Sequence, residues 1–173
     1  MHETAQDVEW LEGLLDRSYD TAGDHLKSIT TPQRRIPATE LGALLPGVQI
    51  LDLATVTGDA KPRVAPVDGL FYRARFYFSS SKTSRRYRHL LARPDVSAAH
   101  TRGEELSIVV HGKANLFSLD DAGYEGFKTY AYDVYIPLYG DEWKKFALSS
   151  DIFYARIDPD LMFTFRMDQP HLP

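Results

Sequence analysis

The stretch "VQILDLATVTGDAKPRVAPVDGLFYRARFYFSS", residues 48–80, decides the fold of this 173-residue chain. It is rich in β-branched and aromatic residues, which favour strands, and turn-forming residues interrupt it. TGDAK and the pair Asp68–Gly69 are hairpin-turn signals. They divide the stretch into three predicted strands at 49–57, 61–67 and 71–79.

The same strand pattern continues outside this stretch. Further strands are predicted at 96–102, 106–117, 152–158 and 162–167, with the last two separated by Pro-Asp-Leu. Helices are predicted at 38–47, 82–93 and 120–132, and residues 135–150 are expected to be irregular. Six or seven mostly antiparallel strands with short loops predict a mainly β protein, a small closed β-barrel with flanking helices.

The N-terminal segment has a helical pattern instead. Apolar residues recur at three- and four-residue steps between 4 and 29, and "TTPQRRIP" (30–37) is a linker because its prolines forbid a continuous helix. We therefore expect two parts, a helical extension with its linker at 1–36 and the barrel domain at 37–173.

Composition excludes several classes of protein. The net charge of −4 argues against global attraction to nucleic acid or to a membrane. No apolar run reaches the length of a membrane span, and the first residues lack a signal-peptide layout, so a cytoplasmic protein is expected. The absence of cysteine excludes a catalytic cysteine, and the six histidines have no metal-ligand spacing, so no metal site is expected.

One segment is basic within this acidic chain. "SSSKTSRRYRH" (79–89) holds four serines, a threonine and four cations, and no Asp or Glu occurs from Gly69 to Pro94. Hydroxyls and backbone N–H groups at a helix N-terminus bind phosphate, and arginine adds fork-shaped charged donors. The predicted strand–helix junction therefore indicates a phosphate site.

Two simpler interpretations remain open for this segment. A serine or threonine caps the helix while the arginines lie in water, or the patch binds nucleic acid. Cations at a helix N-terminus oppose the helix dipole by about 0.3–1 kcal/mol each, which favours a compensating anion. The patch is short and the other helices are acidic, which disfavours nucleic acid.

The order of the motifs resembles a known family. A strand ending in Ala-Thr, a Pro-Arg-x-x-Pro-Val strand, the hydroxyl-rich junction, a Pro-x-Val-Ser strand start and a Gly-x-Ala strand follow one another across residues 38–118. This succession resembles the pyridoxamine 5′-phosphate oxidase-like, FMN-binding split barrels. The resemblance implies a six- to seven-stranded, mostly antiparallel Greek-key barrel.

The resemblance also implies a cofactor site. The family's flavin-contacting strand falls on Arg63, Val64, Ala65, Pro66 and Val67, and its phosphate clamp falls on Ser79, Ser80, Lys82, Thr83, Ser84, Arg85 and Arg86. Arg86 stands where lysine is common and His89 where asparagine is common. A homodimer with the cofactor at the subunit interface is implied, and the aromatic segment 127–146 is expected to wall the groove from the partner.

An FMN-dependent oxidoreductase acting on an unknown small molecule is the function that this resemblance implies. The C-terminal "FTFRMDQPHLP" lacks the arginine motif of true pyridoxamine phosphate oxidases, so that activity is not expected. An F420-dependent reductase, or a non-enzymatic flavin- or haem-binding protein with a stress or sensor role, are the alternatives, and FAD is a further cofactor used on this fold. No catalytic residue is assigned.

Overall fold

The computed structural model describes residues 2–167, so part of the tail compared above, 168–173, lies outside the described residues. Six antiparallel strands form a closed barrel in the order β1-β2-β3-β6-β5-β4. The strands are β1 (Val48–Val56), β2 (Pro62–Tyr72), β3 (Arg75–Ser81), β4 (Asp95–Arg102), β5 (Leu106–Phe117) and β6 (Ile152–Arg166). The predicted β-barrel fold is confirmed.

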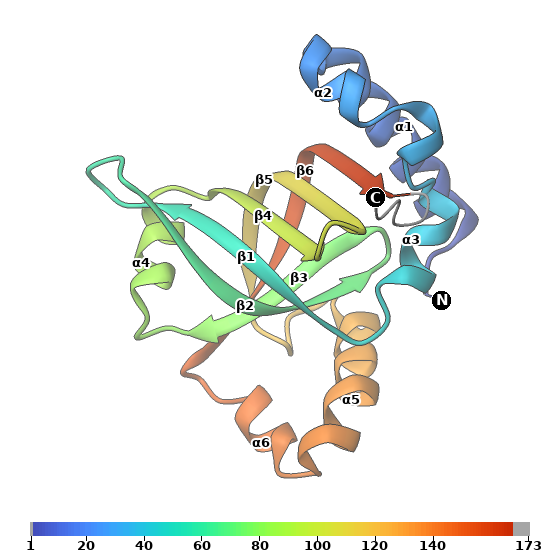
Figure 1. The fold of residues 1–173 in the computed structure, drawn as a ribbon. Helices are drawn as coiled ribbons and strands as arrows, with labels where there is room; N and C mark the ends of the chain where they lie inside the picture. The colour runs from blue at the N-terminus through green and yellow to red at the C-terminus, as the bar shows by residue number, and fades with distance from the viewer. Residues whose placement is uncertain (1, 168–173) are drawn as a thin grey trace.

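Helices lie around this barrel on separate sides (Figure 1). They are α1 (Ala5–Thr21), α2 (Asp24–Ile29), α3 (Ala38–Leu44), α4 (Arg85–Ala92), α5 (Glu125–Tyr139) and α6 (Trp143–Ala147), with a short 3₁₀ turn at Pro32–Arg34. α4 lies beside the β1–β2 hairpin, α1–α3 lie on another side, and α5 and α6 lie together beneath the barrel. No helix within residues 2–167 is long and apolar enough to cross a membrane.

The turn predicted at Asp68–Gly69 is wrong, because both residues lie inside β2. They pair with Ile50 and Gln49 of β1, and a side chain at Gly69 would collide with that of Leu51. The hairpin turns instead at Arg73 and Ala74, whose φ angles are 48° and 63°. Two consecutive positive φ angles give the twist that a two-residue hairpin needs, and here residues other than glycine adopt them.

The two strands predicted at 152–158 and 162–167 are one strand, β6. Pro159 does not end it, because the register with β5 shifts between His111 and Gly112 and a bulge accommodates the proline. A side chain at Gly112 would collide with the backbone of Asp158, so glycine permits this close approach. The barrel therefore has six strands rather than seven.

Helical boundaries also differ from the prediction. The N-terminal helix is interrupted at 22–23, between α1 and α2. α5 begins at Glu125 rather than at 120, and it continues through Pro137 into a region expected to be irregular. Proline has no backbone N–H and so removes one helical hydrogen bond. Only Leu138 and Tyr139 of α5 follow Pro137, so this loss occurs close to the end of the helix.

α1 covers an open edge of the barrel. β6 pairs with β3 only as far as Arg156, so the later backbone groups on that side lack a strand partner. The Ser18 hydroxyl accepts from Met162 N at 3.0 Å. The Tyr19 hydroxyl accepts from Thr164 N at 2.8 Å and donates to Thr164 O at 2.6 Å. These side chains replace a neighbouring strand, and Leu11, Leu14 and Leu15 join the barrel core.

We predict that Tyr19→Phe lowers the free energy of unfolding by about 1–3 kcal/mol, because it leaves buried backbone groups of Thr164 without a partner. Urea denaturation measures the change. Tyr139→Phe is the matched control, since Tyr139 is 61% exposed, and it is expected to have no effect. Equal stability of the two variants would contradict this function of α1.

Candidate cofactor site between the β1–β2 hairpin and helix α4

The strand–helix junction is built by local hydroxyl bonds. β3 ends at Ser81, and α4 begins at Arg85 with Ser84 as its N-cap. The Ser84 hydroxyl accepts from Tyr87 N at 3.2 Å, so the capping interpretation is confirmed for this residue. The Ser81 hydroxyl accepts from Thr83 N at 3.1 Å and bonds the Thr83 hydroxyl at 2.7 Å. These bonds fix the turn that leads from strand to helix.

Arg86 is the exception to the capping interpretation. Its guanidinium is half-buried, donating to the Ser80 hydroxyl at 3.2 Å and to the Pro66 carbonyl at 3.4 Å. None of the ion pairs found within residues 2–167 involves Arg86. Burial lowers the pKa of the guanidinium, because it disfavours the charged form. A positive charge is therefore held at this corner with neutral partners only.

The other cations between Gly69 and Pro94, the range without Asp or Glu, fall into two groups. Arg73 pairs with Asp7 at 3.0 Å, and Arg75 pairs with Asp158 at 3.4 Å. The remaining ones have no carboxylate partner in the part of the chain that the structure describes; these are Lys82, Arg85, Arg88 and Arg93. The uncompensated charge is thus concentrated on and next to α4.

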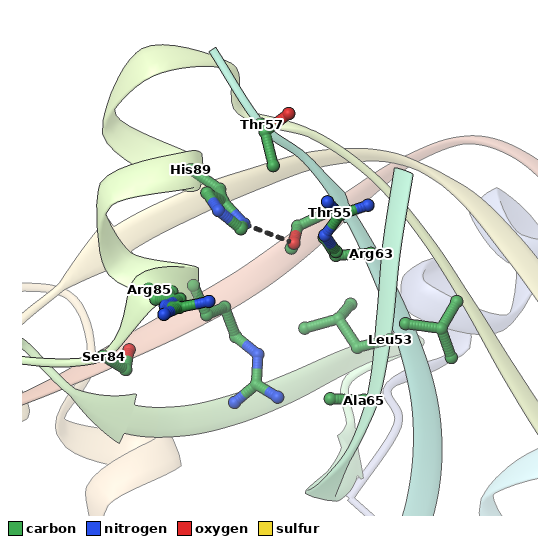
Figure 2. Close-up of a pocket in the computed structure, with 10 residues that line it drawn as sticks. Leu53, Thr55, Thr57, Arg63, Ala65, Ser84, Arg85 and His89 are labelled. Atoms are coloured by element: carbon green, nitrogen blue, oxygen red, sulfur yellow. Dashed lines mark hydrogen bonds between the residues drawn. The ribbon is translucent and has the colours of Figure 1, made fainter. Parts of the chain in front are cut away.

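A first cavity of about 370 Å³ lies between α4 and the β1–β2 hairpin (Figure 2). β1 and β2 supply one wall and the first turns of α4 the other. His89 bonds the Thr55 hydroxyl across the cavity at 3.0 Å through Nδ1. The lining residues are Leu53, Thr55, Thr57, Arg63, Val64, Ala65, Ser84, Arg85, Arg86 and His89. The volume lies within the usual range of small-molecule sites.

A second cavity of about 720 Å³ lies on the other side of Arg86, between the barrel and α5–α6. β2 and β3 contribute Pro66, Val67, Asp68, Ser79, Ser80 and Ser81, and the other lining residues are Arg86, Tyr135, Tyr139, Glu142, Trp143, Phe146 and Ile152. The aromatic segment 127–146 was expected to wall the cofactor groove from the partner subunit. Within one chain, its residues Tyr135, Tyr139, Trp143 and Phe146 line this second cavity.

The structure brings most of the predicted site residues together. Arg63, Val64, Ala65, Ser84 and Arg85 line the first cavity, Pro66, Val67, Ser79 and Ser80 line the second, and Arg86 lines both. Lys82 and Thr83 line neither cavity. Thr83 is bonded to Ser81, and Lys82 N donates to Asp151 O at 2.7 Å.

Sequence reasoning missed several lining residues. Leu53, Thr55 and Thr57 lie at every second position of the chain segment that forms β1 and enters the hairpin, so period-two alternation would have placed them on one face. Tyr135 and Tyr139 were not missed, since they belong to the aromatic segment expected to wall a groove. They are four residues apart on α5 and therefore share a face, although the helix itself was not predicted there.

Comparisons with known proteins identify this fold. No protein-family model matches the chain, and no curated protein matches it. A conserved hypothetical protein from Mycobacterium tuberculosis matches 82% of the chain and 94% of its own, with a TM-score of 0.66 and 16% identity. An FAD-binding protein from Mesorhizobium loti matches 78% and 98%, with a TM-score of 0.58 and 24% identity.

A putative pyridoxamine 5′-phosphate oxidase from Listeria innocua also matches, over 67% of this chain and 87% of its own, with a TM-score of 0.53 and 17% identity. At such identities the shared feature is the fold. The chain therefore has the split-barrel fold of the pyridoxamine 5′-phosphate oxidase-like structures, as the resemblance in its sequence predicted.

Proposed function

We propose that the protein is an FMN-dependent oxidoreductase acting on a small organic molecule, with the FMN phosphate held at the 79–86 corner. One observation carries this proposal: the half-buried Arg86 guanidinium has hydroxyl and carbonyl partners but no carboxylate within residues 2–167. A phosphate offsets the desolvation of this charge and adds charge-assisted hydrogen bonds. Arg85 at the start of α4 supplies a second cation.

The residues of the first cavity fit the rest of a flavin nucleotide. Within the described residues β2 pairs with β3 only at Gly69–Tyr72, so the backbone of Arg63–Ala65 has hydrogen-bonding groups without a strand partner on that side. Leu53, Val64 and Ala65 supply apolar surface to the same cavity. The Thr55 hydroxyl and the His89 imidazole, which are hydrogen-bonded to each other, add polar atoms to the lining of this cavity. When bound, the flavin supplies the electron transfer, whereas these side chains bind it, orient it and exclude water. We assign no catalytic residue.

A homodimer is the proposed assembly, because the outer face of the β1–β2 ladder exposes apolar side chains around two acids, Asp52 and Asp68. Ile50, Asp52, Ala54 and Val56 of β1 lie opposite Asp68, Pro66, Val64 and Pro62 of β2. Val64 is 66% exposed and Ile50 54% exposed. A second copy packed on this face would bury these side chains and close the open side of the first cavity.

The F420-dependent reductase is the alternative on the same fold, since the same cations would hold the phosphate of that coenzyme. The fold match to an FAD-binding protein keeps FAD among the candidates. Absorbance spectra and mass spectrometry of the purified protein distinguish FMN, FAD, F420 and haem. A protein that binds cofactor but shows no turnover with any electron donor would have a storage or sensor role instead of an enzymatic one.

We predict that Arg86→Met weakens FMN binding by roughly 10- to 150-fold, because charge-assisted hydrogen bonds contribute about 1.5–3 kcal/mol. The same change is expected to raise the melting temperature of the cofactor-free protein, since it removes a desolvated charge without an acidic partner. Flavin fluorescence titration and thermal denaturation measure the two effects.

Arg88→Met is the matched control, because Arg88 is exposed on the same helix and lines neither cavity. It is expected to change neither quantity. If the Arg86 and Arg88 variants bind FMN equally well, the phosphate does not lie at this corner.

We predict that Ile50→Glu converts the dimer into monomers, because it replaces an exposed apolar side chain of this face with a third carboxylate beside Asp52 and Asp68. Light scattering after size-exclusion chromatography measures the mass. Leu91→Glu serves as the control, since Leu91 is 63% exposed on α4, which is not part of the β1–β2 ladder. A dimer that persists in the Ile50 variant would place the interface elsewhere.

A further inference from the structure

The second cavity continues the groove of the first. β2 passes from Arg63–Ala65 in the first cavity to Pro66–Asp68 in the second without interruption. The Arg86 side chain lines both and bridges β2 and β3 between them. A molecule whose phosphate lies at Arg86 therefore has space on both sides of that phosphate. FMN, with a single terminal phosphate, would use only one of them.

The wall of the second cavity is a ladder of aromatic rings. Tyr135 stacks on Trp143 with centroids 4.6 Å apart and planes 19° apart, and on Tyr139 at 6.1 Å and 23°. Aromatic residues that serve only packing are buried on their core side. Here Tyr139 is 61% exposed and Phe146 is 55% exposed, and both line the groove, so aromatic surface is accessible to a ligand there. Such surfaces stack on planar bases.

Two carboxylates line the same groove as the rings. Asp68 lies near the Tyr135 hydroxyl, where burial first and then its charge raise the pKa of that phenol. Asp68 takes part in no ion pair within the described part of the chain, whereas Glu142 pairs with Lys145 at 2.8 Å. Carboxylates accept hydrogen bonds from the hydroxyls of a nucleotide ribose. They also repel a coenzyme whose tail beyond the phosphate is acidic.

We propose that the second cavity binds a nucleoside 5′-phosphate, with its phosphate at Arg86, its base on the Tyr135–Tyr139–Trp143 ladder and its ribose hydroxyls toward Asp68 and Glu142. The presence of a cation, stacked rings and carboxylates in the lining of one cavity carries this assignment. The nucleotide has two possible sources: the AMP half of FAD, or the AMP half of a separate dinucleotide that donates electrons. The first source rests on the flavin site proposed above, and the second does not require it.

The test compares FMN, FAD and AMP as ligands of the full-length protein by calorimetry. The variants are Tyr139→Ala and Trp143→Leu, with Leu138→Ala as the matched control, since Leu138 is 61% exposed on the same helix and does not line the cavity. We expect both variants to weaken AMP binding, or to lower the preference for FAD over FMN, by about 5- to 100-fold. FMN affinity is expected to stay near that of the control in both variants. The melting temperature is expected to stay near that of the control in Tyr139→Ala, whereas Trp143→Leu also removes packing against Tyr135 and lowers it.

The ligands separate the two sources and the two proposals. If the unmodified protein prefers FAD over FMN and the ladder variants lose this preference, the site binds the AMP half of FAD. If the unmodified protein binds both flavins equally well, and its AMP binding is weakened in the ladder variants, the site binds the AMP half of a separate dinucleotide. If neither flavin binds while AMP does, the proposed flavin function fails and the nucleotide site stands. The site is refuted if the ladder variants match Leu138→Ala in AMP affinity and in the FAD-to-FMN ratio.

Discussion

The guanidinium of Arg86 is held at the meeting point of β2, β3 and α4, where hydroxyl and carbonyl oxygens contact it. Neutral oxygens accept two of its hydrogen bonds but do not neutralise its charge, and burial weakens the screening by water. Chains usually place an Asp or Glu beside such a group, as this one does for the part-buried Arg75. Because Arg86 has no such partner in residues 2–167, we propose that this corner binds an anion from outside the chain.

The barrel fixes this corner in place. β2 and β3 pair antiparallel, and the capping bonds of Ser84 orient the first turn of α4 toward β2. The interior of the small barrel is filled with side chains, and the two cavities described above lie between the barrel and its helices. α4 and α5–α6 each close one such space, and Arg86 lies at the boundary between them. α1 has a different structural function. Its Ser18 and Tyr19 hydroxyls accept hydrogen bonds from backbone N–H groups of β6 on the side where that strand has no neighbour.

Local signals predicted much of the fold and part of the site. The strand at 106–117 follows from its residue pattern alone and has the predicted bounds. The turn predicted at Asp68–Gly69 was wrong because the glycine has another function. It leaves room for the side chain of Leu51 in the neighbouring strand β1, a contact that the sequence does not show. Likewise, the acids that neutralise Arg73 and Arg75 come from distant segments, so the sequence did not reveal that Arg86 would be the buried cation without one.

A crystal structure of the protein crystallised in the presence of FMN tests the central claim most directly. The account predicts phosphoryl oxygens within hydrogen-bonding distance of the Arg86 guanidinium, between Ser80 and the start of α4. A structure in which Glu142 or another carboxylate of the chain pairs with Arg86, and the phosphate is bound elsewhere or not at all, would contradict it.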